Sequence, residues 1–332
     1  MNKRFLSARL RPAILGAAAI AMGMGAAGAA VAQGWPGRVV TIVVGSGPGS
    51  APDMIARALA EPLGRRLGTT IVVENRAGAT GAIGAAAVAR AAPDASTLLM
   101  MTAAHTITPL LMPNSQFDPD RSFASVAHVA SVPLVLVANP DLGARSLPDL
   151  VRLLRTRPGQ MNYSSPGIGS IQHFATALIL QREGLDAVHV PFRSGDEAVM
   201  AVLSRTADFF FAGMPPALPH LREGRLAALA VSTADRAVAA PEVRTLGEQG
   251  YPGMIADNWH ALVTTAGAPA DRIAQLAAAI QASLAEDEVR ERLLRLGAQA
   301  NFKDPAMLAQ LISSEVVKWR TVAPAAGLAA GR

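Results

Sequence analysis

Cysteine is absent from this 332-residue chain, and aromatic residues make up only 4% of it. The absence of cysteine excludes disulfide bonds, thiolate metal sites and a lipid-modified cysteine at a mature N-terminus. The six histidines show no spacing typical of zinc ligands. After the first 32 residues, no further apolar run is long enough to span a membrane. We therefore expect neither a metal ion nor a cofactor.

Residues 1–32 have the pattern of a secretory signal peptide. Four cations precede an apolar run over residues 13–29, and the small-residue sequence Ala30-Val31-Ala32 follows. Because glycines interrupt the apolar run, we interpret it as a cleaved signal and not as a membrane anchor. The mature chain is expected to begin near Gln33, after cleavage near Ala32, and to be exported.

The charge balance gives no indication of a nucleic-acid partner. The chain has 30 Lys and Arg against 25 Asp and Glu, but four of the cations lie in the signal, which leaves 26 against 25. A nucleic-acid-binding protein needs basic residues gathered in a patch or stripe, and in this chain they are scattered singly. We expect no nucleic acid among the partners.

Strand and helix patterns alternate along the first half of the mature chain. The segment 39–44 is a continuous apolar run, typical of a strand buried on both faces, and residues 53–67 follow helical spacing. The remaining elements of this set are strands at 71–73 and 97–101, a helix at 81–91 and a polar loop at 102–105. This order predicts an α/β unit with a parallel sheet.

A second set of the same units follows. Its elements are strands at 134–138, 162–164, 188–190, 209–211 and 226–231, a helix from a capping box at Ser146 to about 155, and a helix at 171–183. The chain then passes through 259–263 and ends in helices at about 272–284, 288–296 and 305–322. A mature chain of roughly 300 residues is long enough for two such domains.

Two Gly/Ser loops, 45–50 and 165–170, each lie between a strand and a helix. Backbone N–H groups at a helix N-terminus, together with the helix dipole, form an anion-binding site. If both loops face one cleft, they would hold an anionic ligand. The alternative is that these glycines serve the strand-to-helix turn alone. Asp53 is similarly ambiguous, and a helix N-cap is its more ordinary role.

The enzyme motifs that these loops suggest are incomplete. The glycine spacing after the first strand differs from G-x-G-x-x-G, Pro52 interrupts the loop, and the G-x-x-x-x-G-K-[ST] phosphate loop is absent. Ser170 and His173 lie close together on one helix, but the chain has no G-x-S-x-G nucleophile elbow. We expect a protein without catalytic residues.

An ordered set of short motifs runs along the whole mature chain. They are Trp35-Pro36, 39–44, Pro48-Gly49, Asp53, 72–79, 92–94, 97–99, 117–119, Phe123, 158–163, 164–173, 188–191, 217–220 and Trp319. Together they resemble the substrate-binding proteins of tripartite tricarboxylate transporters, the Bordetella uptake gene family.

This resemblance implies a two-lobed, type II-like periplasmic binding protein of the α/β class. Each lobe would be a mostly parallel sheet flanked by helices, with lobe 1 at 33–132 plus 258–332 and lobe 2 at 133–257. Two crossovers, near 132–134 and 257–260, would let the lobes close on a ligand.

The resemblance also implies a function. The protein would capture a small carboxylate (a di- or tricarboxylate or a related organic acid) as a monomer and deliver it to the membrane permease subunits of a tripartite transporter. The alternative is a periplasmic sensor that presents the bound acid to a membrane receptor kinase.

Site residues carried over by position form two walls. The first comprises Ser46, Gly47, Pro48, Gly49, Ser50, Asp53, Thr102, Ala103 and His105. The second comprises Ser165, Gly167, Gly169, Ser170, Arg193, Gly195, Ala212 and Gly213. Ser50 stands where the family often has glycine, and Ala212-Gly213 where many members have Asp-Asn. Because that carboxylate is missing, we expect acids to be preferred over amino acids. Arg193 either pairs with a ligand carboxylate or is a solvated surface residue.

Overall fold

The computed structural model describes residues 35–112 and 114–325. The chain divides into two units, Met1–Trp35 and Pro36–Arg332, and all of the helices and strands named below belong to the second. The expected signal peptide lies outside the described residues. Among the helices of the described segments, none is both long and apolar enough to cross a bilayer.

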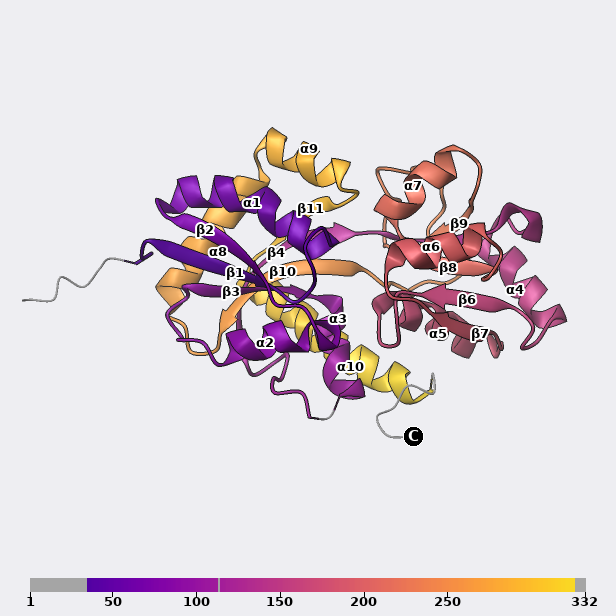
Figure 1. Cartoon of the computed structure of the whole chain (residues 1–332), viewed down its shortest axis with the longest axis horizontal. Coiled ribbons are helices and arrows are strands. Elements are labelled where there is room, and N and C mark those ends of the chain that lie inside the picture. Colours follow the sequence, from indigo (N-terminus) through magenta and orange to yellow (C-terminus); the bar gives the residue numbers. More distant parts are fainter. Residues whose placement is uncertain (1–34, 113, 326–332) are drawn as a thin grey trace, which may run out of the picture. The chain divides into compact units, whose positions relative to one another are not determined.

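The first sheet has six strands in the order β11-β4-β10-β3-β1-β2. Its strands are β1 (Val39–Val44), β2 (Thr70–Asn75), β3 (Thr97–Thr102), β4 (Phe123–Val132), β10 (Asn258–Thr265) and β11 (Gln299–Lys303). Its helices are α1 (Ala51–Leu67), α2 (Ala82–Ala89), α3 (Ala103–Leu111), α8 (Ala270–Leu284), α9 (Asp287–Arg295) and α10 (Pro305–Ala325). α1 packs against β2, and α8 packs against α1 and β4 (Figure 1).

The second sheet has five strands in the order β7-β6-β8-β5-β9. They are β5 (Leu134–Ala138), β6 (Asn162–Ser165), β7 (Val188–Pro191), β8 (Phe209–Gly213) and β9 (Ala227–Val231). The helices are α4 (Leu147–Thr156), α5 (Ile171–Glu183), α6 (Gly195–Leu203) and α7 (Met214–Arg222). Three short 3-10 turns, η1 (Ala79–Gly81), η2 (Pro140–Leu142) and η3 (Gly247–Gln249), complete the elements.

Alternation along the strands of the second sheet divides its core into two layers. On β5, Leu134 and Leu136 pack with Phe174 of α5 on one face, while Val135 and Val137 pack with Val199 of α6 on the other. Successive side chains of a strand point to opposite faces, so a strand covered on both sides is a continuous apolar run. This is why the apolar run at 134–138 predicted the strand correctly.

The two-sheet α/β architecture is confirmed: both sheets are mixed, and in each of them most strands run in one direction. β1 is parallel to β2 and β3, whereas β10 is antiparallel to β3 and β4. β6 is parallel to β7 and β8, whereas β5 is antiparallel to β8 and β9. The antiparallel pairs arise at the connections between the sheets. The chain enters the second sheet through β5 and returns to the first through β10. Each of these strands is antiparallel to the strand by which the chain leaves that sheet, β9 and β4 respectively.

The carboxyl edges of the two sheets meet at this connection. β4 and β3 both pair antiparallel with β10, so β4 runs in the same direction as β3 and ends at the same edge, at Val132. After Pro133 the chain begins β5 at Leu134, which pairs with Gly213, the last residue of β8. One residue therefore separates the carboxyl edge of the first sheet from that of the second.

The second connection stays hydrogen-bonded to the first. Asn258 on β10 pairs with Val132 on β4. On the other side, the Ser232 amide donates to the Leu134 carbonyl at 3.0 Å, and the Ala256 amide donates to the Ser232 carbonyl at 3.1 Å. The strands of the first sheet fall within 33–132 and 258–332 and those of the second within 133–257, and these lobe boundaries stay a proposal.

Candidate ligand-binding site

Helices begin directly at the carboxyl edges of both sheets. α1 follows β1 and α3 follows β3 in the first sheet, while α5, α6 and α7 follow β6, β7 and β8 in the second. The first N–H groups of a helix have no intrahelical partner, and the dipole adds a partial positive charge. Several helix N-termini suited to binding anions therefore lie along the two edges.

The loop before α1 is held from within by Asp53. The Gly49 amide donates to Asp53 Oδ2 at 2.9 Å, and Arg57 and Asn75 donate to Oδ1 at 3.0 and 2.9 Å. Burial would raise the pKa of Asp53, but these hydrogen bonds outweigh it and lower the pKa. The N-cap of α1 is Ser50, so the interpretation of Asp53 as the N-cap is wrong. Asp53 is the third helical residue, and its carboxylate oxygens already accept hydrogen bonds from within the protein.

Three glycines allow this loop to lie against α2. A Cβ added at Gly45 would lie 2.7 Å from Gly81 Cα, and one at Gly84 would lie 3.1 Å from Gly45 Cα. Gly81 is the N-cap of α2 and has a φ of 90°, a conformation that side chains strain. A side chain at Gly45 or Gly84 would push the two backbones apart, and one at Gly81 would meet the ring of His105.

The start of α3 was expected to be a polar loop, which is wrong: Thr102 is a helix N-cap. His105, at the third helical position, accepts a hydrogen bond from the Thr102 amide on Nδ1 at 3.0 Å. Its side chain is buried, and burial lowers its pKa to about 4. A Cβ on Gly81 would lie 2.8 Å from His105 Nε2. His105 therefore fixes the start of α3 against the start of α2.

A cavity of about 320 Å³ lies where these segments meet. It is lined by Gly45, Ser46, Pro52, Ala77, Gly78, Thr80, Gly81, Met100, Thr102, Ala104 and His105. None of these residues carries a formal charge when His105 is neutral. The cavity offers hydroxyl groups, backbone amides and an apolar wall, and no cation or carboxylate.

The loop before α5 is also closed by its own hydrogen bonds. Ser165 Oγ lies 2.7 Å from His189 Nε2, and Ser165 Oγ accepts from the Gly167 amide at 3.1 Å. Ser170 is the N-cap of α5 and accepts from the His173 amide at 3.2 Å, while His173 Nδ1 accepts from the Gly169 amide at 3.3 Å. The loop is thus shaped before any ligand arrives.

The two histidines under this loop are stacked. The ring centroids of His173 and His189 lie 3.8 Å apart, and Tyr163 stacks on His189 at 4.9 Å. Burial, and next the neighbouring His189, lower the pKa of His173 to about 3. Burial also lowers the pKa of His189. Both rings are therefore neutral near pH 7.

The other expected residues of the second wall are less suited to an anion. Ala212 is fully buried within β8. The Met214 amide at the start of α7 donates to the Pro133 carbonyl at 3.0 Å, and the two following residues are prolines without N–H groups. Gly195 opens α6 beside two first-turn carboxylates, and Arg193 is an exposed residue whose amide donates to Glu197.

Two contacts connect elements of the two sheets beside this region. A Cβ at Gly169 would collide with Leu111 Cδ1 at the end of α3. A Cβ at Gly297 would lie 2.6 Å from Pro215 at the start of α7. The loop before α5 therefore lies against α3, the helix that contributes to the cavity.

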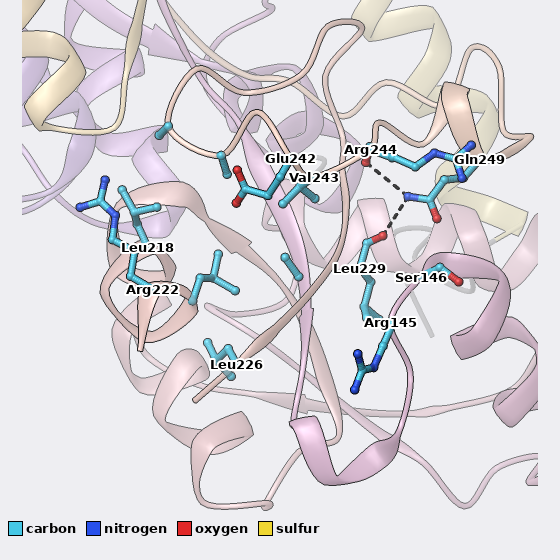
Figure 2. A pocket seen from close by; sticks show the side chains of 14 residues that line it. Arg145, Ser146, Leu218, Arg222, Leu226, Leu229, Glu242, Val243, Arg244 and Gln249 are labelled. Carbon is cyan, nitrogen blue, oxygen red and sulfur yellow. Dashed lines mark hydrogen bonds between the residues drawn. The ribbon is translucent and has the colours of Figure 1, made fainter. Parts of the chain in front are cut away.

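A second, larger cavity of about 440 Å³ lies within the second sheet's helices and loops. Figure 2 shows Leu218, Leu226 and Val243 around it, with Arg222 and Glu242 at its side. Gln249 donates to the Leu229 carbonyl at 2.8 Å.

No expected site residue lines this cavity. Ser146, the N-cap of α4, is in the lining, but α4 follows β5, which is antiparallel to both of its neighbours. The residues of α7 in the lining, Leu218, Leu221 and Arg222, lie after its first turn. We therefore place the candidate site at the smaller cavity.

The structure brings Ser46, Thr102 and His105 together at one cavity and adds a segment that the sequence did not indicate, Ala77–Gly81. Gly47, Pro48, Gly49 and Ser50 in the loop before α1, and Ala103 at the first position of α3, do not line it. The signal for the missed segment was present: Ala77-Gly78-Ala79 closed one of the family motifs, directly after a strand. In the described segments, no group of three or more His, Asp or Glu side chains is arranged to hold a metal ion.

Comparison with known proteins finds relatives along most of the chain. A model of the tripartite tricarboxylate transporter family receptor matches residues 55–328. BugT of Bordetella pertussis is 33% identical over 293 residues, covering 88% of this chain and 90% of that protein. The structure of the periplasmic binding protein BugD is 29% identical with a TM-score of 0.76, covering 90% of this chain and all of that one.

Two further solved structures are similar and hold carboxylates. Rpa4515 of R. palustris with adipate is 29% identical with a TM-score of 0.79, covering 90% of this chain and 100% of its own. MatC of Rhodopseudomonas palustris with bound malate is 30% identical with a TM-score of 0.75, covering 87% of this chain and 99% of that one.

Proposed function

The chain belongs to the tripartite tricarboxylate transporter receptor family, and from this premise we propose that it captures a small di- or tricarboxylate, or a related organic acid, and delivers it to the membrane permease of a tripartite transporter. It is a periplasmic solute-binding protein of that family and not an enzyme. We further propose that residues 1–32 are a signal peptide, which directs export to the periplasm and is cleaved near Ala32.

The observation that carries the proposal is the uncharged cavity at the carboxyl edge of the first sheet. Its lining includes Ala104, in the first turn of α3, whose amide belongs to the helix end. An anion placed there meets N–H groups and hydroxyls, and each charge-assisted hydrogen bond contributes on the order of 1.5–3 kcal/mol. Three or four such bonds, less the cost of association, are compatible with micromolar affinity, roughly −8 kcal/mol.

The lining also supports a preference among small molecules. An amino acid carries an ammonium group, which needs a carboxylate or several carbonyl acceptors, and no Asp or Glu side chain lines the cavity. Met100, Ala77 and Pro52 provide apolar contact instead. A ligand with one or more carboxylates on a short hydrocarbon or hydroxylated chain fits this lining best.

The test is a thermal-shift and calorimetric titration of the mature chain after unfolding, dialysis and refolding to remove carried ligand. The panel contains dicarboxylates from four to six carbons, tricarboxylates, amino acids, sugars and nucleotides. A ligand present at 100 times its dissociation constant stabilises by about 2.7 kcal/mol. We expect a selective rise in melting temperature with one or more of the acids.

The matched control is the diamide of each acid that binds, which keeps the chain length and removes the charge. We expect the diamide to produce no shift. A shift as large with the diamide as with the acid, or a response confined to sugars or nucleotides, would contradict the proposal. Transport is tested separately, by uptake of the labelled acid in cells that have or lack the receptor.

A further inference from the structure

Four of the helices that begin at the two carboxyl edges, α1, α3, α5 and α6, close their first turn with a side chain at the third helical position. In α1 the residue is Asp53 and in α6 it is Glu197, whereas in α3 it is His105 and in α5 it is His173. α4, which does not begin at a carboxyl edge, uses Asp149. A Glu or Gln at this position is the usual partner in a capping box.

In each of these helices the side chain at the third position accepts a backbone hydrogen bond, which comes from the N-cap amide in α3 and from the amide of the residue before the N-cap in the other four. A carboxylate accepts it in α1, α4 and α6, from the amides of Gly49, Arg145 and Arg193 at 2.9, 3.1 and 3.1 Å. In α3 and α5 an imidazole Nδ1 accepts it, from Thr102 at 3.0 Å and Gly169 at 3.3 Å. The imidazole thus replaces the carboxylate as acceptor without supplying its negative charge.

We propose that His105 and His173 are positioning residues that close the first turns of α3 and α5 without a carboxylate, so that these two helix ends remain attractive to the ligand's carboxylate. The inference rests on the proposed function and names the two helix ends that act in it.

The charge state of the rings agrees with this role. A Nδ1 that accepts a backbone N–H carries no proton, so each ring is neutral with its proton on Nε2. Burial favours the neutral form of both, since it lowers the pKa of His105 to about 4 and, together with the neighbouring His189, that of His173 to about 3. Neither α3 nor α5 has an acidic residue in its first turn.

The competing helix ends are less favourable for independent reasons. α6 has two carboxylates, Asp196 and Glu197, in its first turn. α7 has prolines at its second and third positions, and its first amide is taken by Pro133. The cavity lies at the first turn of α3, and the loop of α5 contacts the same helix at its other end, where Gly169 lies against Leu111.

The experiment compares two substitutions at each histidine. His105→Gln and His173→Gln keep a neutral acceptor, whereas His105→Glu and His173→Glu keep an acceptor and add a charge. Affinity is measured for an acid that the wild type binds, with melting temperature and circular dichroism as the record of folding. With charges about 7 Å apart at an effective dielectric near 20, we expect each Glu variant to bind roughly 10–50-fold more weakly than the Gln variant at the same position.

Two further variants keep the test decisive if a buried Glu prevents folding. Gln172→Glu adds the same charge at a half-buried position in the first turn of α5, where folding is not at risk, and is expected to weaken binding several-fold. Asp149→Asn changes the corresponding position of α4 and is expected to leave affinity unchanged.

A purely structural role predicts a different pattern, because Glu is a good capping residue. Folded Glu variants that bind as tightly as the Gln variants, or an unchanged affinity in Gln172→Glu, would overturn the inference alone. Gln variants as weak as the Glu variants would also overturn it, since the imidazole itself would then contact the ligand. A wild type that binds no carboxylate would overturn the proposed function first.

Discussion

Replacing Gly45 by alanine tests whether the cavity depends on the close approach of two backbones. The added Cβ would lie 2.7 Å from Gly81 Cα and 3.0 Å from Gly81 O. These neighbours are backbone atoms, so no side-chain rotation can relieve the contact. Either the loop before α1 or the start of α2 has to move.

The magnitude follows from the packing. Inserting a methyl group into a well-packed region typically costs about 1–3 kcal/mol. With an unfolding entropy of about 2.1 cal/mol/K per residue, a chain of this length should lose roughly 2–5 °C in melting temperature. Because Gly45 and Gly81 both line the cavity, affinity for the ligand should fall as well.

Gly47→Ala is the matched control. Gly47 lies in the same loop, and a Cβ added there meets no atom within 4 Å. Urea unfolding followed by circular dichroism gives the free energy of unfolding for both variants, and calorimetry gives their affinities. Equal stability of the Gly45 and Gly47 variants would refute the reasoning, because backbone contact is the feature that separates the two positions.

Two further predictions concern residues beside the connection between the sheets. Burial, opposed by a hydrogen bond from Ser131, raises the pKa of Asp257 from 3.8 to about 6. The stability contributed by its protonated form is therefore fully present below about pH 4 and is lost as the pH rises through 6. Asp257→Asn should therefore gain on the order of 1–2 kcal/mol over wild type between pH 4 and pH 7 in urea titrations; parallel pH profiles would contradict this. Gly169→Ala should weaken binding by displacing Leu111, and Leu111→Ala should restore part of the loss, whereas strictly additive effects would show that the two residues do not meet.

The bounds of an element could be predicted from the sequence where residues at its own ends mark where it begins and stops. α5 begins after the N-cap Ser170 and ends before Gly184 in a left-handed conformation, and its bounds were predicted as observed. The strand at Val39–Val44 was also predicted with its bounds. In both cases the sequence pattern and the tertiary surroundings favour the same structure.

Other elements had no such signal. α3 was not predicted because its cap uses Thr102 and His105, and a histidine is not the usual partner in a capping box. β11, with the sequence Gln299-Ala300-Asn301-Phe302-Lys303, is an edge strand without apolar alternation, and it forms because β4 offers a free edge. Its pairing is decided by distant residues, which a local pattern does not contain.

Site residues divide in the same way. The loop glycines were recognisable from their position between a strand and a helix. The engagement of Asp53 was not, because Asn75 donates to it from 22 positions away along the chain. The participation of Ala77–Gly81 depends on the approach of Gly81 to Gly45, which is a property of the folded backbone.

The pairing of β4 with β10 has a mechanical consequence for capture of the ligand. The two strands are hydrogen-bonded up to Val132 and Asn258, where the chain leaves the first sheet. Sliding one strand past the other would break several backbone hydrogen bonds at once, whereas bending or twisting the pair as a ribbon keeps them. We therefore expect the two carboxyl edges to approach each other by rotation about this two-stranded ribbon when a ligand binds. The ribbon would then set the direction of closure, and the ligand's contacts would determine its extent.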